Sequence, residues 1–232
     1  LDFQVLGPSA NSEDSVDVLL AASRKEKVDD RVMVAELAGL KPVIIDVEPY
    51  AARISIDSII SQLPAGGEGL ILAVFDIGQT ATRLSVVYNG QTIFEREQPF
   101  GGSKLTQEIV RLYGLTVEEA ELKKRTGDLP ENYTTELLHP FVEEGATELA
   151  RSLQFFFSST PYERVDRIFL AGGAAVTPGL AEAVLQKTSV TTEILSPFQG
   201  MEIGDSISEK QMNLDAPALL VSCGLAMRRF DQ

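Results

Sequence analysis

Short apolar runs alternate with amphipathic stretches along the chain, and their lengths predict a mixed α/β protein. Residues 1–7 and 16–22 have the length and composition of β-strands, and residues 24–40 place valine and alanine at helical spacing. Residues 42–47 predict a further strand and residues 48–63 a further helix. Because strands alternate with helices here, we expect a parallel sheet with covered faces.

The middle of the chain predicts three consecutive antiparallel strands, at residues 70–78, 81–88 and 91–99. Asn89-Gly90 is a strong hairpin signal between the second and third strands. A buried strand is also expected at residues 167–170.

Capping residues mark the expected helices of the second half. Ser103 is predicted to cap one helix, and Thr116 with Glu119 forms a capping box for the next. A long helix is expected at residues 140–158. Thr177 is predicted to cap a helix that starts at Pro178, and a final apolar helix is expected at residues 215–229.

Composition and charge exclude several classes of protein. The 232 residues carry a net charge of −14, which repels nucleic-acid phosphates and anionic lipids, and no apolar run is long enough to insert into a membrane. The single cysteine, Cys223, excludes an internal disulfide and fits a reducing compartment. The single histidine, His139, has no second histidine or cysteine nearby, which argues against a metal site or nucleophile triad.

Two glycine-containing turns follow predicted buried strands. After Asp76, the turn at Gly78 can aim backbone amides at phosphate oxygens, while the carboxylate can hold water around Mg²⁺. Gly172-Gly173 lets the backbone approach a nucleoside before the next helix. An ordinary hairpin and a plain strand-to-helix connection remain the alternatives.

Three segments in this order resemble the actin-like ATPase superfamily, which includes actin, the seventy-kilodalton heat-shock chaperone, FtsA and PilM. They are residues 46–52, 75–80 and 170–178. The resemblance implies an α/β, actin-like ATPase (ribonuclease H-like) fold with two lobes. It also implies that ATP or ADP binds with Mg²⁺. The residues it assigns to the cofactor are Asp76, Gly78, Gln79, Thr80, Gly101, Gly102, Glu121, Lys124, Gly172, Gly173 and Ala174.

Two of the implied roles are chemical. Asp76 is the expected metal-binding residue, and Glu48 lies where the chaperone has an acid that could polarise the attacking water. The alternative for Glu48 is a helix-capping role beside Pro49. For Glu121 and Lys124 the alternative is an ordinary surface ion pair.

Within the superfamily, the chain resembles the PilM family of type IV pilus assembly proteins. The resemblance runs from Leu1 to Gln232 and is carried by residues 21–26, 37–40, 46–48, 100–106 and 152–157. It implies a cytoplasmic nucleotide-binding scaffold that lies at the inner membrane through its protein partners. The expected partners are the cytoplasmic N-terminal segment of the membrane protein PilN and other pilus motor or platform proteins. Self-association through an exposed sheet edge is a further expectation.

The same resemblance predicts how the chain is divided. Residues 1–66 are expected to be the remainder of a first lobe, with Pro64–Gly67 at its boundary. Residues 67–214 are expected to form a second lobe with an inserted helical subdomain at about 103–138. Residues 215–232 are expected to form a helix that packs back toward the first lobe. The chain is thus interpreted as a family member without its first third.

Departures from the superfamily pattern weaken the case for catalysis. Gln79 and Thr80 stand where the chaperone has glycines, and Ala81 and Arg83 replace a threonine and an aspartate. Asp-x-Gly does not occur before Asp76, so half of the phosphate site is expected to be absent and nucleotide binding to be weak. The favoured reading is therefore binding without efficient turnover. The alternatives are an active ATPase or kinase, and the cytoplasmic domain of a type II secretion L-type protein.

Overall fold

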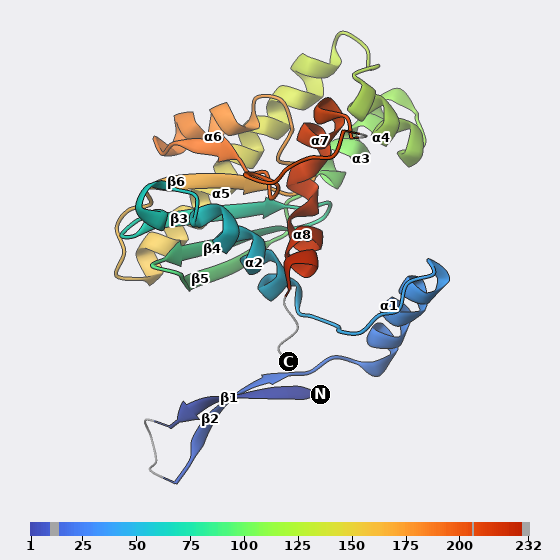
Figure 1. Cartoon of the computed structure of the whole chain (residues 1–232). Helices are drawn as coiled ribbons and strands as arrows, with labels where there is room; N and C mark the ends of the chain where they lie inside the picture. Colours follow the sequence, from blue (N-terminus) through green and yellow to red (C-terminus); the bar gives the residue numbers. More distant parts are fainter. Residues whose placement is uncertain (10–13, 206, 229–232) are drawn as a thin grey trace. The chain divides into compact units, whose positions relative to one another are not determined.

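The computed structural model describes residues 1–9, 14–205 and 207–228. The chain divides into two compact units, Leu1–Val47 and Glu48–Gln232. We describe each unit separately (Figure 1). The predicted three-part division at residues 66 and 214 stays a prediction.

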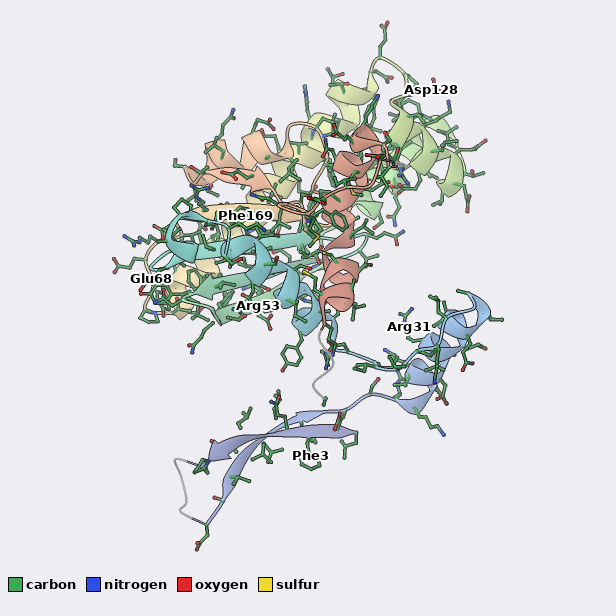
Figure 2. All side chains as sticks on the ribbon, in the orientation of Figure 1. Phe3, Arg31, Arg53, Glu68, Asp128 and Phe169 are labelled. Atoms are coloured by element: carbon green, nitrogen blue, oxygen red, sulfur yellow. The ribbon has the colours of Figure 1, made fainter. Side chains whose placement is uncertain are left out.

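The first unit contains a hairpin and one helix. Strands β1 (Asp2–Pro8) and β2 (Val16–Ala21) pair in antiparallel fashion, and α1 covers Lys25–Leu37. All three elements were predicted from the sequence. Their burial is low, because α1 has no buried residue and Phe3 of β1 is 65% exposed (Figure 2).

The prediction of a strand at residues 42–47, and with it a parallel sheet in this region, is wrong. No strand is assigned there, and no ladder pairs these residues with any described strand. Val43 is 65% exposed and Ile45 is 49% exposed. An apolar run becomes a strand only where a neighbouring strand satisfies its backbone groups, and the described residues provide none.

The second unit is built on a mixed five-stranded sheet in the order β5-β4-β3-β6-β7. The antiparallel strands β3 (Ile71–Ile77), β4 (Thr82–Tyr88) and β5 (Gln91–Gln98) confirm the three predicted strands. The expected strand β6 (Arg167–Ala171) runs parallel to β3, and β7 (Thr192–Ile194), which was not predicted, runs parallel to β6.

Helices cover both faces of this sheet (Figure 1). One face carries α5 (His139–Ser159) and α6 (Leu180–Thr188), with α3 (Ser103–Tyr113) and α4 (Val117–Thr126) next to them. The other face carries α2 (Glu48–Ile60) and α8 (Leu220–Met227). The shorter helical segments are η1 (Pro64–Gly67), η2 (Thr134–Leu138), α7 (Glu209–Asp215) and η3 (Ala216–Leu219).

Alternating residues of β3 divide the core between the two faces. Phe75 and Ile77 pack toward α5, while Leu72 and Val74 pack toward α2 and α8 together with Phe169, which is labelled in Figure 2. Helices α2 and α8 lie very close to each other. A Cβ added at Gly224 of α8 would be 1.7 Å from the carbonyl oxygen of Ala51 in α2.

Helix boundaries test the predicted caps. The Thr116–Glu119 capping box is present, as predicted. Ser103 is wrong as a cap because Gly102 occupies that position and Ser103 is the first helical residue. Helix α6 starts at Leu180 rather than at Pro178, because Gly179 takes a left-handed φ of 84° just before it.

The final helix is also divided differently from the prediction. The segment from Glu209 onward contains α7, η3 and α8 in place of one helix that begins at Asp215. Proline at position 217 lacks an amide hydrogen, which suits the start of a short 3-10 turn between the two helices. Residue 229, the predicted end, lies outside the described residues.

Candidate functional site

The turn after β3 presents backbone amides at the end of a buried strand. Asp76 is the penultimate residue of β3, and the amide of Gly78 donates to the carbonyl of Ala81 at 2.9 Å. Within the part of the chain that the structure describes, the amides of Gln79 and Thr80 have no acceptor, and both residues are exposed. They are therefore available to an external anion.

The Gly101-Gly102 segment is hydrogen-bonded directly to this turn. The amide of Gly102 donates to the Gly78 carbonyl at 3.0 Å, and the amide of Ser103 donates to the Gln79 carbonyl at 2.8 Å. A Cβ at Gly101 would lie 2.5 Å from the Gln79 carbonyl oxygen. Only glycine permits this approach without moving the turn.

The third predicted loop, at Gly172, packs on the same strand end. Gly172 has a φ of +87°, and a Cβ there would lie 2.4 Å from the Ile77 carbonyl oxygen. The amide of Ala174 donates to that carbonyl at 3.0 Å, and the amide of Gly172 donates to the Pro217 carbonyl at 2.7 Å. Gly173 is exposed beside this contact. The fold thus brings together the three glycine loops that the sequence predicted.

Glu121 and Lys124 do more than form a surface pair. The Lys124 ammonium lies 2.8 Å from Glu121 and donates to the buried hydroxyl of Thr106 at 2.7 Å. Partial burial is the largest single effect on the pKa of Glu121 and raises it, but the hydrogen bonds from Lys124 and Thr106 and the charges of Lys124 and Arg125 together lower the pKa below its usual range. Thr106 also lies 3.2 Å from the Gly102 carbonyl, which links this polar cluster to the second loop.

An open hollow of about 190 Å³ lies beside the turn. Its lining comes from the turn, from the strands on either side of it and from the start of α2. The lining residues are Glu48, Asp76, Gly78, Gln79, Thr80, Ala81, Arg83 and Glu97.

Asp76 has the environment expected of a cation-binding carboxylate. Burial raises its pKa above the usual range, the charge of Glu48 raises it further, and the charge of Arg83 lowers it. Its carboxylate accepts no hydrogen bond from any of the described residues. Mg²⁺ in nucleotide sites is held by one or two carboxylates together with phosphates and water, and Asp76 fits that role. Among the described residues, no group of three or more His, Cys, Asp or Glu side chains is placed to hold a metal ion.

Arg83 is the functional candidate that the sequence prediction missed, since it was noted only as a departure from the superfamily pattern. Asp76, Arg83 and Glu97 lie opposite one another on β3, β4 and β5, so their side chains share one face of the sheet. The guanidinium pairs with Glu97 at 3.0 Å and with Glu48 at 3.3 Å. The register of three adjacent strands is the signal that could have found it.

A family model described as "Type IV pilus assembly protein PilM" matches residues 1–230. The chain belongs to the PilM family. The structure of a PilM–PilN type IV pilus biogenesis complex is similar to it, with 27% sequence identity and a TM-score of 0.77. That alignment covers 98% of this chain and 65% of the PilM–PilN chain, so the chain spans 65% of the length of this relative.

Two more distant structures share the fold. The ethanolamine utilization protein EutJ from Carboxydothermus hydrogenoformans is 19% identical with a TM-score of 0.61, and the alignment covers 88% of this chain and 62% of EutJ. MreB5 of Spiroplasma citri bound to AMPPNP is 16% identical with a TM-score of 0.55, and the alignment covers 89% of this chain and 65% of MreB5. The predicted α/β actin-like ATPase fold is therefore confirmed. Among the described residues, no helix is long and apolar enough to cross a bilayer.

Proposed function

We propose that this PilM-family chain is a nucleotide-binding scaffold for type IV pilus assembly, and that ATP or ADP binds with Mg²⁺ at the hollow beside Asp76. The observation that carries this proposal is that the loops at Gly101-Gly102 and Gly172-Gly173 both pack on the end of β3 and the turn at Gly78. Gly101 and Gly172 each bring a backbone into contact with the Gly78–Thr80 turn or the strand before it, where a side chain would not fit. Such loops leave room for a nucleotide and offer amides to its phosphates.

Each group of residues has a distinct part in this proposal. Gln79 and Thr80 would donate amide hydrogen bonds to the phosphates, and Gly173 with Ala174 would lie against the nucleoside. Asp76 would hold a hydrated Mg²⁺, which would supply positive charge to the phosphates. Glu121 and Lys124 would bind the adenosine. Both belong to a polar cluster with Thr106, and the Thr106 hydroxyl lies within hydrogen-bond distance of the Gly102 carbonyl in the second loop. MreB5, which has the same fold, was solved with AMPPNP.

The residues of the turn after β3 favour binding over turnover. Gln79 and Thr80 stand where the superfamily pattern has glycines, so their side chains narrow the approach to a terminal phosphate. Ala81 replaces a threonine of the same pattern and offers no polar side chain. We therefore propose slow hydrolysis or none, with nucleotide serving to order the protein.

The proposed protein partner is the cytoplasmic N-terminal segment of PilN. The support is the similarity of 98% of this chain to part of a PilM–PilN complex. Attachment through PilN would hold the protein at the cytoplasmic side of the inner membrane without contact with anionic lipid, in keeping with the net charge of −14.

A nuclear magnetic resonance titration of the isotope-labelled chain with MgATP tests the proposal, because it detects weak binding and locates it. We expect the amide signals of Gln79, Thr80 and Gly173 to shift. Gly101→Ala should weaken binding by about tenfold or more, because its Cβ would displace Gln79. Gly204→Ala is the matched control, since Gly204 lies outside the hollow, has no left-handed φ and has nothing within 4 Å of its Cβ position.

The outcomes separate the nucleotide site from the PilN assignment. The nucleotide site would be wrong if MgATP shifted no amide signals in the three loops. It would also be wrong if Gly101→Ala stayed folded and bound MgATP as the unmodified chain does. The same labelled sample, titrated with a peptide of the cognate PilN N-terminal segment, should show a second set of shifts. Absence of that second set would remove the partner assignment and leave the nucleotide result standing.

A further inference from the structure

The charge balance of the hollow points to Arg83 as more than a structural arginine. Three carboxylates, Asp76, Glu48 and Glu97, line the hollow, and of the described lining residues Arg83 alone is cationic. A nucleotide brings further negative charge into the same space. Without a positive group next to the phosphates, these carboxylates would oppose its entry.

The two ion pairs of Arg83 differ in how firmly the fold holds them. Glu97 lies directly opposite Arg83 on the adjacent strand and contacts Nη2 at 3.0 Å. Glu48 comes from a separate element, the first turn of α2, and contacts Nη1 at the longer distance of 3.3 Å. The two carboxylates are equally exposed, at 60% for Glu48 and 59% for Glu97, so the difference lies in the strand pairing that holds Glu97 next to Arg83 and does not hold Glu48. The Glu48 contact is therefore the one that an incoming anion can replace.

A terminal phosphate can compete with Glu48 for Nη1, because it carries about −1.5 to −2 charges and a carboxylate carries −1. Guanidinium–phosphate hydrogen bonds are charge-assisted, and the planar group can remain bound to Glu97 on one side while it turns its other side to a new acceptor. Gln79 and Thr80, whose amides lack acceptors among the described residues, line the same hollow as Arg83.

We propose that Arg83 senses the terminal phosphate of the bound nucleotide by exchanging Glu48 for that phosphate while it keeps Glu97. The inference rests on the proposed nucleotide site and assigns that site a preference for triphosphate over diphosphate.

Calorimetric titrations of the full chain with MgATP and with MgADP test this assignment. Arg83→Gln is expected to weaken MgATP binding by about tenfold and MgADP binding by less than about threefold. Glu48→Gln is expected to tighten MgATP binding by about two- to threefold, because it removes the carboxylate that competes for Nη1. Arg96→Gln, an arginine from β5 that lies over the Phe155 ring at 4.0 Å and outside the hollow, should leave both affinities unchanged.

Each other outcome has a definite meaning. If the unmodified chain binds neither nucleotide, the proposed function fails and the sensing role fails with it. If the chain binds both and Arg83→Gln leaves the two affinities as they were, or tightens MgATP, the sensing role is wrong and the nucleotide site stands. Weaker MgATP binding by Glu48→Gln would also overturn the exchange. Arg83→Lys, which keeps the charge without the forked geometry, should give an intermediate loss and guards against a folding defect in Arg83→Gln.

Discussion

The two compact units of this chain start from similar apolar patterns and reach different degrees of burial. In the second unit, β3 is buried on both faces, and Phe75 and Ile77 have no exposed surface. In the first unit, β1 and β2 pair with each other, yet Val18 is 46% exposed and Leu20 is 61% exposed. The difference lies in what covers each sheet within its own unit.

This contrast separates local preference from tertiary support. A short apolar run is enough to predict a strand at residues 16–22, and β2 forms there at Val16–Ala21. Burial additionally needs a second layer, which α5 and α2 provide for β3. Within the first unit α1 provides no such cover, because none of its residues is buried. The second unit should therefore be much more stable than the first, although both contain apolar strand sequences.

Hydrogen exchange measures the largest expected difference between the units. Amides of β3 and α5 should exchange only through global unfolding, which for a domain of this size corresponds to about 5–15 kcal/mol. Amides of α1 should exchange through local opening at a free energy of about 0–2 kcal/mol. Equal protection of the α1 and β3 amides from exchange would show that the first unit is stabilised by contacts beyond its own residues. The proposed difference in stability between the units would then be wrong.

The same glycine-to-alanine change in each unit gives the next largest effect. Gly224→Ala should lower the free energy of unfolding by about 3 kcal/mol, because its Cβ would lie 1.7 Å from the Ala51 carbonyl oxygen and would force α2 and α8 apart. Thermal denaturation followed by circular dichroism should then show a midpoint about 6–12 °C lower.

Gly39→Ala is the matched substitution in the first unit. Gly39 has a φ of +76°, but nothing lies within 4 Å of its Cβ position. The change should cost about 1 kcal/mol locally and leave the main thermal transition within about 2 °C. A large fall in the midpoint with Gly39→Ala, or none with Gly224→Ala, would contradict the assignment of the cooperative core to the second unit.

The features of the fold that could be predicted are those set by local sequence, and the features that were missed depend on tertiary contacts. Asn89-Gly90 and the Thr116–Glu119 capping box are local signals that act within a few residues, and the structure confirms what they predicted. The strand at residues 42–47 depended on a partner strand that a local pattern does not reveal. The late start of α6 depended on the left-handed Gly179, which was passed over in favour of the Thr177-Pro178 signal.

The candidate site shows a similar limit. Each glycine loop was located from its own sequence, and the fold brings the loops into contact through Gly78, Gly102 and Ala174. Arg83 was missed because its importance depends on strand register, which places it between Asp76 and Glu97. Roles of this kind become visible only when three strands are aligned.

The smallest expected effect concerns Asp76, whose burial raises its pKa above the unfolded value. A carboxyl group with a raised pKa in the folded state contributes stability that is complete below its unfolded pKa and is lost as the pH rises through its folded pKa. Asp76→Asn is uncharged at every pH and avoids this loss. The variant should therefore be more stable than the unmodified chain at neutral pH, and the difference should shrink as the pH falls below the unfolded pKa.

Urea denaturation of both proteins at several pH values between 3 and 7 measures this difference. Asp29→Asn, which changes an exposed carboxylate of α1 in the first unit, is the matched control and should leave the stability unchanged at each pH. The gain in stability with Asp76→Asn should be accompanied by loss of MgATP binding, because asparagine lacks the negative charge that would hold the hydrated Mg²⁺. Lower stability of Asp76→Asn at neutral pH would mean that the attraction of Arg83 outweighs burial, and that Asp76 is held as an ion-pair partner and not kept for a cation.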